Sequence, residues 1–146
     1  MRKLLFLSFA AIIAVSCNSD KATIKAKIDG LKNGELVLKV LRLNAQSVVD
    51  TIKTDAEGSF IYRAGKLSDM PEFYYLYYKE RKVASLILEG GDKIYLTTDT
   101  LGTSVSVEGS QESSLLNELE RDLAEKDRVF EALLSEMNNA IQSKNT

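Results

Sequence analysis

Residues 22–43 read ATIKAKIDGLKNGELVLKVLRL. At the start of this stretch apolar and polar residues alternate, so that Ile24 and Ile28 share one face of a predicted strand and lysines lie on the other. The segment GLKNG, 30–34, supplies the residue types that turns require. The segment ELVLKVLRL, 35–43, is apolar on both faces in its first half, which favours a central strand. The stretch therefore predicts two strands joined by a turn.

The same alternation of short strands and turns continues to Glu108. Asp55 and Gly58 bracket a predicted hairpin turn, in which Gly58 is free to adopt a positive φ. Gly90 and Gly91 are interpreted as a second hairpin turn. Regularly spaced strands without intervening helices predict a mainly β fold, an antiparallel sandwich or barrel of about seven to eight short strands. We assign this β-domain to residues 22–109.

The pattern changes at Ser110, which is a predicted helix N-cap. Residues 110–146 contain no proline or glycine, and their apolar residues follow a heptad spacing, which predicts one long C-terminal amphipathic α-helix. Acidic residues flank this apolar stripe and disfavour a parallel homodimer, so we expect a monomer. We expect residues 115–130 to pack against the sheet, and the turns after Met137 to fray or to reach a protein partner.

The composition restricts the chemistry open to the chain. It has 146 residues with a formal net charge of −2, no histidine and one cysteine. The commonest general base and metal ligand is therefore missing, and no disulfide or paired-cysteine centre can form within the chain. Asp50, Asp55 and Glu57 lack the spacing of a calcium-binding loop. We expect a protein that is not an enzyme, with no metal or other cofactor and no nucleic-acid partner.

The single cysteine, Cys17, follows a segment typical of an export signal. Arg2 and Lys3 precede a 12-residue apolar run, whose helical length of about 18 Å is short of the roughly 30 Å of a hydrocarbon core. The tetrapeptide AVSC, 14–17, resembles a bacterial lipobox. The resemblance implies cleavage after Ser16 and lipid attachment at Cys17. The alternative is an ordinary cleavage site that happens to precede a cysteine.

On the lipobox interpretation, residues 1–16 are a lipoprotein signal peptide and residues 17–21 a lipidated tether. Four polar residues after the cysteine reach at most about 14 Å, so the folded body would lie close to the membrane. We therefore expect a membrane-anchored lipoprotein of the bacterial cell envelope, facing the periplasm or associated with the outer membrane. Its membrane partner would be reached through the lipid on Cys17.

The segment EFYYLYYKE, which begins at Glu72, concentrates five aromatic residues in a predicted strand. Tyr74 and Tyr78 share one face of that strand. One interpretation is an exposed aromatic surface, including Tyr74 and Tyr78, that binds a glycan or an apolar ligand. The alternative, which we favour, is a strand with one face in the core and the other beneath the C-terminal helix.

Several segments, taken in order, resemble the bacterial family called domain of unknown function 4369. These segments are IKAKIDGLKNGELVL at 24–38, VDTIKTDAEGSF at 49–60, PEFYYL at 71–76, LEGGDKIYL at 88–96 and VEGSQESSLLNEL at 107–119. The resemblance implies the N-terminal β-domain of lipoproteins that also carry a thioredoxin-like domain. The cysteine pair of that second domain is not present in this sequence, and the resemblance implies no catalytic residue in the β-domain.

The favoured hypothesis is a non-catalytic, lipid-anchored envelope protein whose β-domain is an interaction or accessory module. Two alternatives remain open. One is a truncated or split thiol–disulfide oxidoreductase that lacks its thioredoxin domain. The other is a β-domain that binds a small ligand or glycan near Tyr74 and Tyr78.

Overall fold

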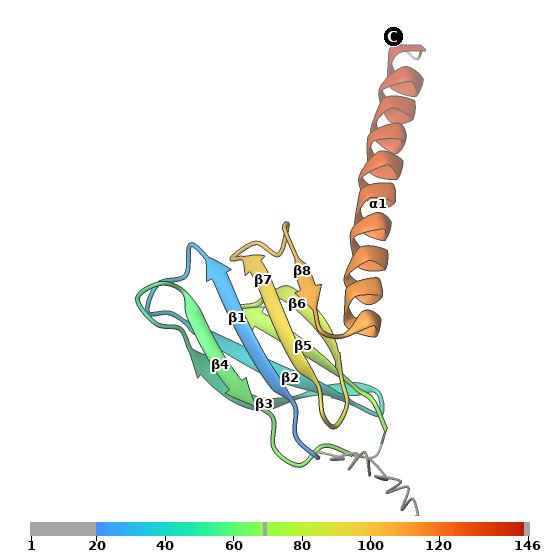
Figure 1. The fold of residues 1–146 in the computed structure, drawn as a ribbon. Coiled ribbons are helices and arrows are strands. Elements are labelled where there is room, and N and C mark those ends of the chain that lie inside the picture. The colour runs from blue at the N-terminus through green and yellow to red at the C-terminus, as the bar shows by residue number, and fades with distance from the viewer. Residues whose placement is uncertain (1–19, 69, 145–146) are drawn as a thin grey trace, which may run out of the picture.

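The structure is a computed structural model, and it describes residues 20–68 and 70–144. The predicted signal peptide and Cys17 lie outside the described residues. Figure 1 shows a β-sandwich followed by one long helix, as the sequence predicts. In chain order the elements are β1 (Thr23–Asp29), β2 (Glu35–Arg42), β3 (Ala45–Lys53), β4 (Ser59–Arg63), β5 (Glu72–Tyr78), β6 (Arg81–Leu88), β7 (Lys93–Asp99), β8 (Ser106–Glu108) and α1 (Gln111–Lys144).

The strands form two four-stranded sheets that pack face to face. One sheet has the order β4-β1-β7-β8 and the other the order β3-β2-β5-β6. β2 pairs with both β3 and β5, which confirms the central position predicted from its apolar sequence. The edge strands beside the helix are β6 in one sheet and β8 in the other (Figure 1).

One strand pair departs from the predicted antiparallel arrangement. β1 and β7 pair in parallel, from Thr23 opposite Lys93 to Asp29 opposite Asp99. The whole of the other sheet lies between them in the sequence, so local patterns give no sign of their pairing. Parallel neighbours require such a long crossover because a tight turn cannot return the chain in the same direction.

The core lies between the sheets and follows the period-two pattern of the strands. In β1, β2 and β7 the inward-facing residues are buried and most of the residues between them are not. Each fully buried Leu, Ile or Val contributes roughly 1.5–3 kcal/mol through removal of its side chain from water. The largest fully buried apolar side chains are Ile24, Ile28, Leu36, Leu38, Leu76, Val83, Leu86, Leu88, Ile94 and Leu96.

The two predicted hairpin turns are real turns, but they do not form hairpins. At the first, Asp55 accepts backbone hydrogen bonds from Glu57 and Ser59 on its carboxylate, and Gly58 has the predicted positive φ of 84°. The turn nevertheless joins β3 of one sheet to β4 of the other. The turn at Gly91 likewise joins β6 to β7 across the sandwich. Both turns are therefore corners between sheets.

Helix α1 begins beside the end of the sandwich at which the described chain starts, and it runs past the opposite end. Gly109, just before the helix, lies against the carbonyl of Lys93. The backbone N–H of Thr23 donates to the neighbouring carbonyl of Asp92 at 2.8 Å, which places the start of β1 at the same end. In Figure 1 the helix passes β8 and β6 and then projects away from both sheets.

Candidate functional site

The start of α1 is fixed by two serines. The Ser110 hydroxyl accepts a hydrogen bond from the backbone N–H of Ser113 at 3.2 Å, which confirms the predicted N-cap. The Ser110 hydroxyl also donates to Oγ of Ser113 at 3.0 Å. Glu112 lies in the first turn, where its negative charge is favourable to the helix dipole. Ser113 itself is fully buried, although serine is a surface residue in most helices.

Ser113 and Asn117 bind the unpaired backbone edge of β6. The hydroxyl of Ser113 accepts from the N–H of Ile87 at 2.9 Å and donates to its carbonyl at 3.0 Å. Asn117 repeats the pattern at Ser85: its Oδ1 accepts from the Ser85 N–H at 3.2 Å, and its Nδ2 donates to the Ser85 carbonyl at 2.6 Å. The helix thus provides the donors and acceptors that a neighbouring strand would provide.

The spacing of these side chains matches the strand. Ser113 and Asn117 are four residues apart on a helix, a rise of about 6 Å. Ile87 and Ser85 are two residues apart on a strand, a distance of about 6.6 Å. The near equality of the two distances lets consecutive turns of α1 reach consecutive outward-facing backbone groups of β6.

A third contact continues the row toward the start of β6. The Ser85 hydroxyl donates to the Glu120 carboxylate at 2.9 Å, and Nζ of Lys82 lies 2.7 Å from the same carboxylate. Ser113, Asn117 and Glu120 define one polar face of α1, which we call the docking face. The attachment of the helix therefore relies mainly on hydrogen bonds, and of the apolar residues in this part of α1 only Leu116 is half-buried.

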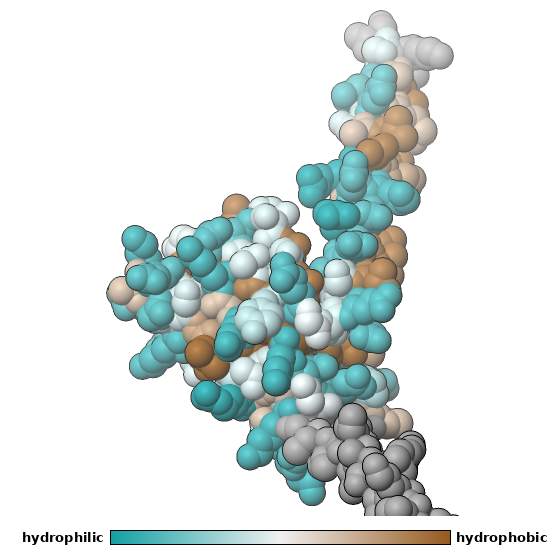
Figure 2. Space-filling view, viewed as in Figure 1, coloured by the Kyte–Doolittle hydropathy of each residue, from teal (hydrophilic) through white to brown (hydrophobic). Residues whose placement is uncertain are grey.

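The apolar stripe of α1 lies roughly a third of a turn away from the docking face and is exposed. This corrects the prediction that residues 115–130 pack on the sheet: Leu119 is 57% exposed and Phe130 is 60% exposed. Figure 2 shows the stripe as hydrophobic surface on the side of the helix turned away from the sandwich. Its exposed large apolar residues are Leu115, Leu119, Leu123, Val129, Phe130, Leu133, Met137 and Ile141.

The stripe is interrupted by one cation and bordered by acids. Lys126 lies in line with the stripe between Leu123 and Phe130. The helical positions along the two borders are rich in carboxylates, and every residue from 121 to 143 is exposed except the half-buried Leu134. The border acids are Glu118, Asp122, Glu125 and Glu136 on one side, and Asp127 on the other.

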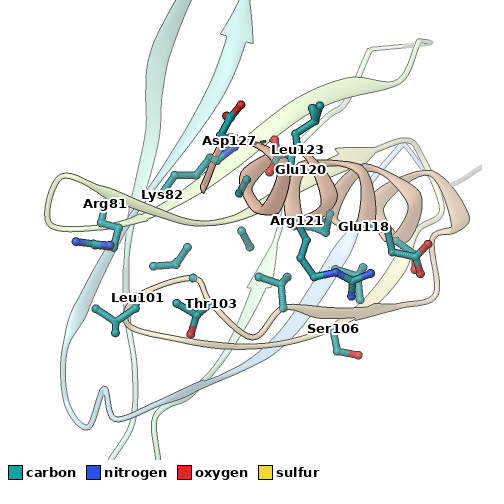
Figure 3. Close-up of a pocket in the computed structure, with 18 of the residues that line it drawn as sticks. Arg81, Lys82, Leu101, Thr103, Ser106, Glu118, Glu120, Arg121, Leu123 and Asp127 are labelled. Atoms are coloured by element: carbon teal, nitrogen blue, oxygen red, sulfur yellow. Dashed lines mark hydrogen bonds and ion pairs between the residues drawn. The ribbon is translucent and has the colours of Figure 1, made fainter. Parts of the chain in front are cut away.

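A groove of about 750 Å³ lies between α1 and the sandwich. Figure 3 shows the helix residues Arg121 and Asp127 on one side, with Leu101 and Thr103 of the β7–β8 loop on the other. The lining mixes positive and negative side chains, and Lys82 and Glu120 pair with each other. Within the described residues, no buried side-chain nitrogen or oxygen lacks a hydrogen-bond partner, so no such group is left unpaired for a ligand.

The structure turns both tyrosines proposed as a binding surface toward the core. Tyr74 is only 5% exposed, so the prediction of an exposed surface that includes it is wrong. Burial, followed by the negative charge of Glu72, raises the pKa of Tyr74 to about 12. Tyr78 is half-buried and packs against the core. Both rings contribute to the interior of the sandwich because β5 is a central strand.

The opposite face of β5 is not covered by α1, whose contacts are with β6 and β8. The prediction that this second face of the strand lies beneath the C-terminal helix is therefore wrong. Two of the rings on this face make cation–π contacts with lysines. Nζ of Lys39 lies 4.1 Å from the ring centre of Tyr77, and Nζ of Lys82 lies 5.6 Å from the ring centre of Tyr75. Such contacts stabilise the surface and place a cation over one face of each ring.

The carboxylates of Asp55 and Asp99 accept hydrogen bonds from the backbone of their own turns. Hydrogen bonds from the backbone of Ser59 and Glu57 lower the pKa of Asp55. At the β7–β8 turn, the hydroxyl of Thr103 lowers the pKa of Asp99. Among residues 20–68 and 70–144, no group of three or more His, Cys, Asp or Glu side chains is placed to hold a metal ion.

Sequence reasoning missed Ser113 and Asn117. The available signal was a serine and an asparagine four residues apart, at the start of a helix whose other faces are apolar or charged. Such a pair in a long helix is unfavourable by propensity. Ser135 and Asn139 repeat the spacing on the exposed part of α1, however, so the pair alone does not identify a contact. The partner strand could not be inferred, because nothing in the sequence identifies β6 as an edge.

Comparison with known families gives one result for the chain. The model of a family described as "Domain of unknown function (DUF4369)" matches residues 22–116, which include all eight strands and the first turns of α1. No curated protein matches the sequence. In the part of the chain that the structure describes, no helix combines the length and apolar character that crossing a membrane requires.

Proposed function

Because the chain belongs to the domain of unknown function 4369 family, whose description gives no activity, we propose a function from the chain's own architecture. The protein is a non-catalytic, lipid-anchored interaction module of the bacterial cell envelope. Its sandwich is a rigid platform, and α1 is an arm that docks onto another protein.

The exposed apolar stripe is the observation that carries this proposal. Eight large apolar side chains along one helix face are more than half exposed, from Leu115 to Ile141. Contiguous apolar surface of this kind marks an interaction site in a soluble domain. The stripe is not a remnant of poor packing, because α1 is held to the sandwich through a different, polar face.

The direction of the arm fits an anchor at Cys17. The chain enters the sandwich near Lys93, and α1 starts at the same end and runs toward the opposite one. The tether between Cys17 and Ala22 is short, so a lipid on Cys17 would hold this end of the sandwich at the membrane. The arm would then point away from the membrane, with a length of about 50 Å.

The anchor is tested by cell fractionation of Cys17→Ser beside Ser19→Ala as the matched control. Wild type and the control should be found in the membrane fraction and incorporate labelled palmitate. Cys17→Ser should be soluble or should keep its signal peptide. A Cys17→Ser protein that fractionates and migrates like wild type would contradict lipid anchoring.

The docking arm is tested separately by photo-crosslinking in intact cells. A photoreactive amino acid at Leu133, on the stripe, should give a defined adduct with a single protein. The same amino acid at Ser135, on the opposite face of the helix, should not. Equal labelling at the two positions, or none at Leu133, would contradict docking through the stripe.

A further inference from the structure

We infer that the stripe of α1 binds an amphipathic helix of another protein, and that lysine and arginine border the apolar face of that helix. This inference rests on the proposed docking function and adds the chemistry of the partner. It is carried by the shape of the stripe, by the charges along its two borders and by the repulsion that a second copy would meet.

The shape of the exposed surface fits a helix. The stripe runs from Leu115 to Ile141 along one side of a single helix, a length of about 39 Å. It is narrow and convex, and its residues recur at heptad spacing. Another helix can lie along such a seam and insert its side chains between successive turns, over nearly four heptads.

The borders of the stripe determine the charge of the partner. Acids lie along both sides, with Asp122 and Glu136 on one border and Asp127 on the other. These residues are exposed: Asp127 lies at the groove beside the sandwich, and Glu136 lies on the part of α1 that projects from it. In paired helices, residues beside the apolar seam face charged residues of the partner and select opposite charges. Lysine or arginine at these positions of the partner would pair with the acids.

A second copy of the chain would not provide opposite charges for the acids along these borders. With Leu116 at heptad position a, a parallel pair places Asp122 of one copy opposite Asp127 of the other. An antiparallel pair that overlaps the whole stripe places Asp127 opposite its own counterpart, and Asp122 opposite Glu136. Like charges face each other in both arrangements, so a heterologous basic partner is favoured.

Lys126 adds a feature that sets the register. It occupies a position on the seam where an apolar residue is expected, and it is exposed. A single charged seam residue lowers the affinity of an all-apolar partner and favours one that places an acid opposite it. The partner helix is therefore basic along its borders with one acid on its seam.

The test is a binding measurement with two synthetic helical peptides of about four heptads. Both carry leucine and isoleucine on the seam and one glutamate opposite Lys126. One peptide has lysine and arginine on its borders, and the other has glutamate there. Fluorescence anisotropy of each labelled peptide is recorded with the full chain in phosphatidylcholine nanodiscs, and empty nanodiscs provide the background. The basic peptide should bind at least about tenfold more tightly, and added salt should weaken its binding.

Three variants locate the interaction. Leu133→Glu places a charge on the seam and should abolish binding of the basic peptide. Ser135→Glu, on the opposite face, should leave binding unchanged. The double variant Asp122→Lys, Glu136→Lys should reverse the preference toward the acidic peptide. Circular dichroism of each variant establishes that α1 is retained, so that a loss of binding is not a loss of folding.

The outcomes separate this inference from the proposed function. Equal binding of the two peptides, or tighter binding of the acidic one, overturns the inference about charge while docking through the stripe stands. Binding of neither peptide overturns the inference, and light scattering then shows whether a second copy covers the stripe. If Leu133 gives an adduct in cells but neither peptide binds, the proposal that α1 docks onto a protein stands. The partner is then not a basic amphipathic helix.

Discussion

Asn117 makes three hydrogen bonds through its side chain at the contact between helix and sandwich. Its amide satisfies both backbone groups of Ser85, and its Nδ2 also donates to the carbonyl of Ser113 at 2.6 Å. At neutral pH, no other natural side chain of this size has a donor and an acceptor in the same plane. The residue is therefore specified by hydrogen-bond geometry rather than by helix propensity, which is poor for asparagine.

Replacing Asn117 by alanine should lower the free energy of unfolding by about 1–3 kcal/mol. The N–H and carbonyl of Ser85 would lose their partners in a partly buried position, and that loss is the main cost. Denaturant unfolding followed by circular dichroism measures the change. Asn139→Ala, on the exposed part of α1, is the control and should change stability by less than about 0.5 kcal/mol. Equal effects of the two substitutions would show that the contact contributes nothing.

Tyr74 should give the fold a dependence on alkaline pH. Burial raises its pKa to about 12, above the ordinary value near 10, so the folded state favours the protonated phenol. The resulting stability is fully present below pH about 10 and is lost as the pH rises through about 12, with a slope of at most about 1.4 kcal/mol per unit. Denaturant titrations across this range should show a shallower decline for Tyr74→Phe than for wild type. Parallel declines would contradict the assignment.

Among the elements, the joint between β8 and α1 determines where the helix points. Gly109 has a φ of 87°, and a Cβ at this position would lie 2.1 Å from the carbonyl oxygen of Lys93. A backbone carbonyl in a sheet cannot move aside as a flexible side chain does. The direction of α1 is therefore fixed by close contact between backbones just before its first turn.

Gly109→Ala should lower the free energy of unfolding by about 1–3 kcal/mol through left-handed strain and the clash with Lys93. Gly65→Ala is the matched control, because its φ is not in the left-handed region and nothing lies within 4 Å of the added atom. The control should be neutral or slightly stabilising. Thermal unfolding of both variants measures the difference, and a neutral Gly109→Ala would show that the joint adjusts without strain.

At the scale of the whole molecule, α1 has two halves with different roles. Its first turns cover the edge of β6, and unpaired edges are sites of association between β-proteins. Its later turns make an exposed arm and are not needed to complete the sandwich. The same helix therefore covers an edge at which strands could associate and, on our proposal, presents a second surface for association.

Two truncations should separate these roles. A chain that ends at Ala124 keeps the docking face, and its unfolding midpoint in denaturant should match that of the full chain. A chain that ends at Gly109 exposes the N–H and C=O groups of Ser85 and Ile87, and it should be less stable and should self-associate. Sedimentation velocity measures the association. A monomeric and equally stable chain ending at Gly109 would show that the helix does not protect the edge.

The features of the fold that depend on residues close together in the chain could be predicted from the sequence. Alternation in 22–29 and the apolar run in 35–43 correctly indicated strands, and the second of these is central. Ser110 was correctly predicted as the N-cap of one long helix. Gly58 has its predicted positive φ. Each of these features depends on residues within a few positions of one another, which is the range that a sequence pattern describes.

Only the tertiary structure decided which elements meet. The turn at Gly58 has the chemistry of a hairpin but joins two sheets, because β4 pairs with β1 and not with β3. The apolar stripe of α1 predicted the wrong contact face for a physical reason. An apolar face laid on the edge of β6 would have left the backbone groups of Ser85 and Ile87 without partners, whereas Ser113 and Asn117 provide them. Hydrogen-bonding demand at an edge strand outweighed hydrophobic burial, and the stripe remains exposed.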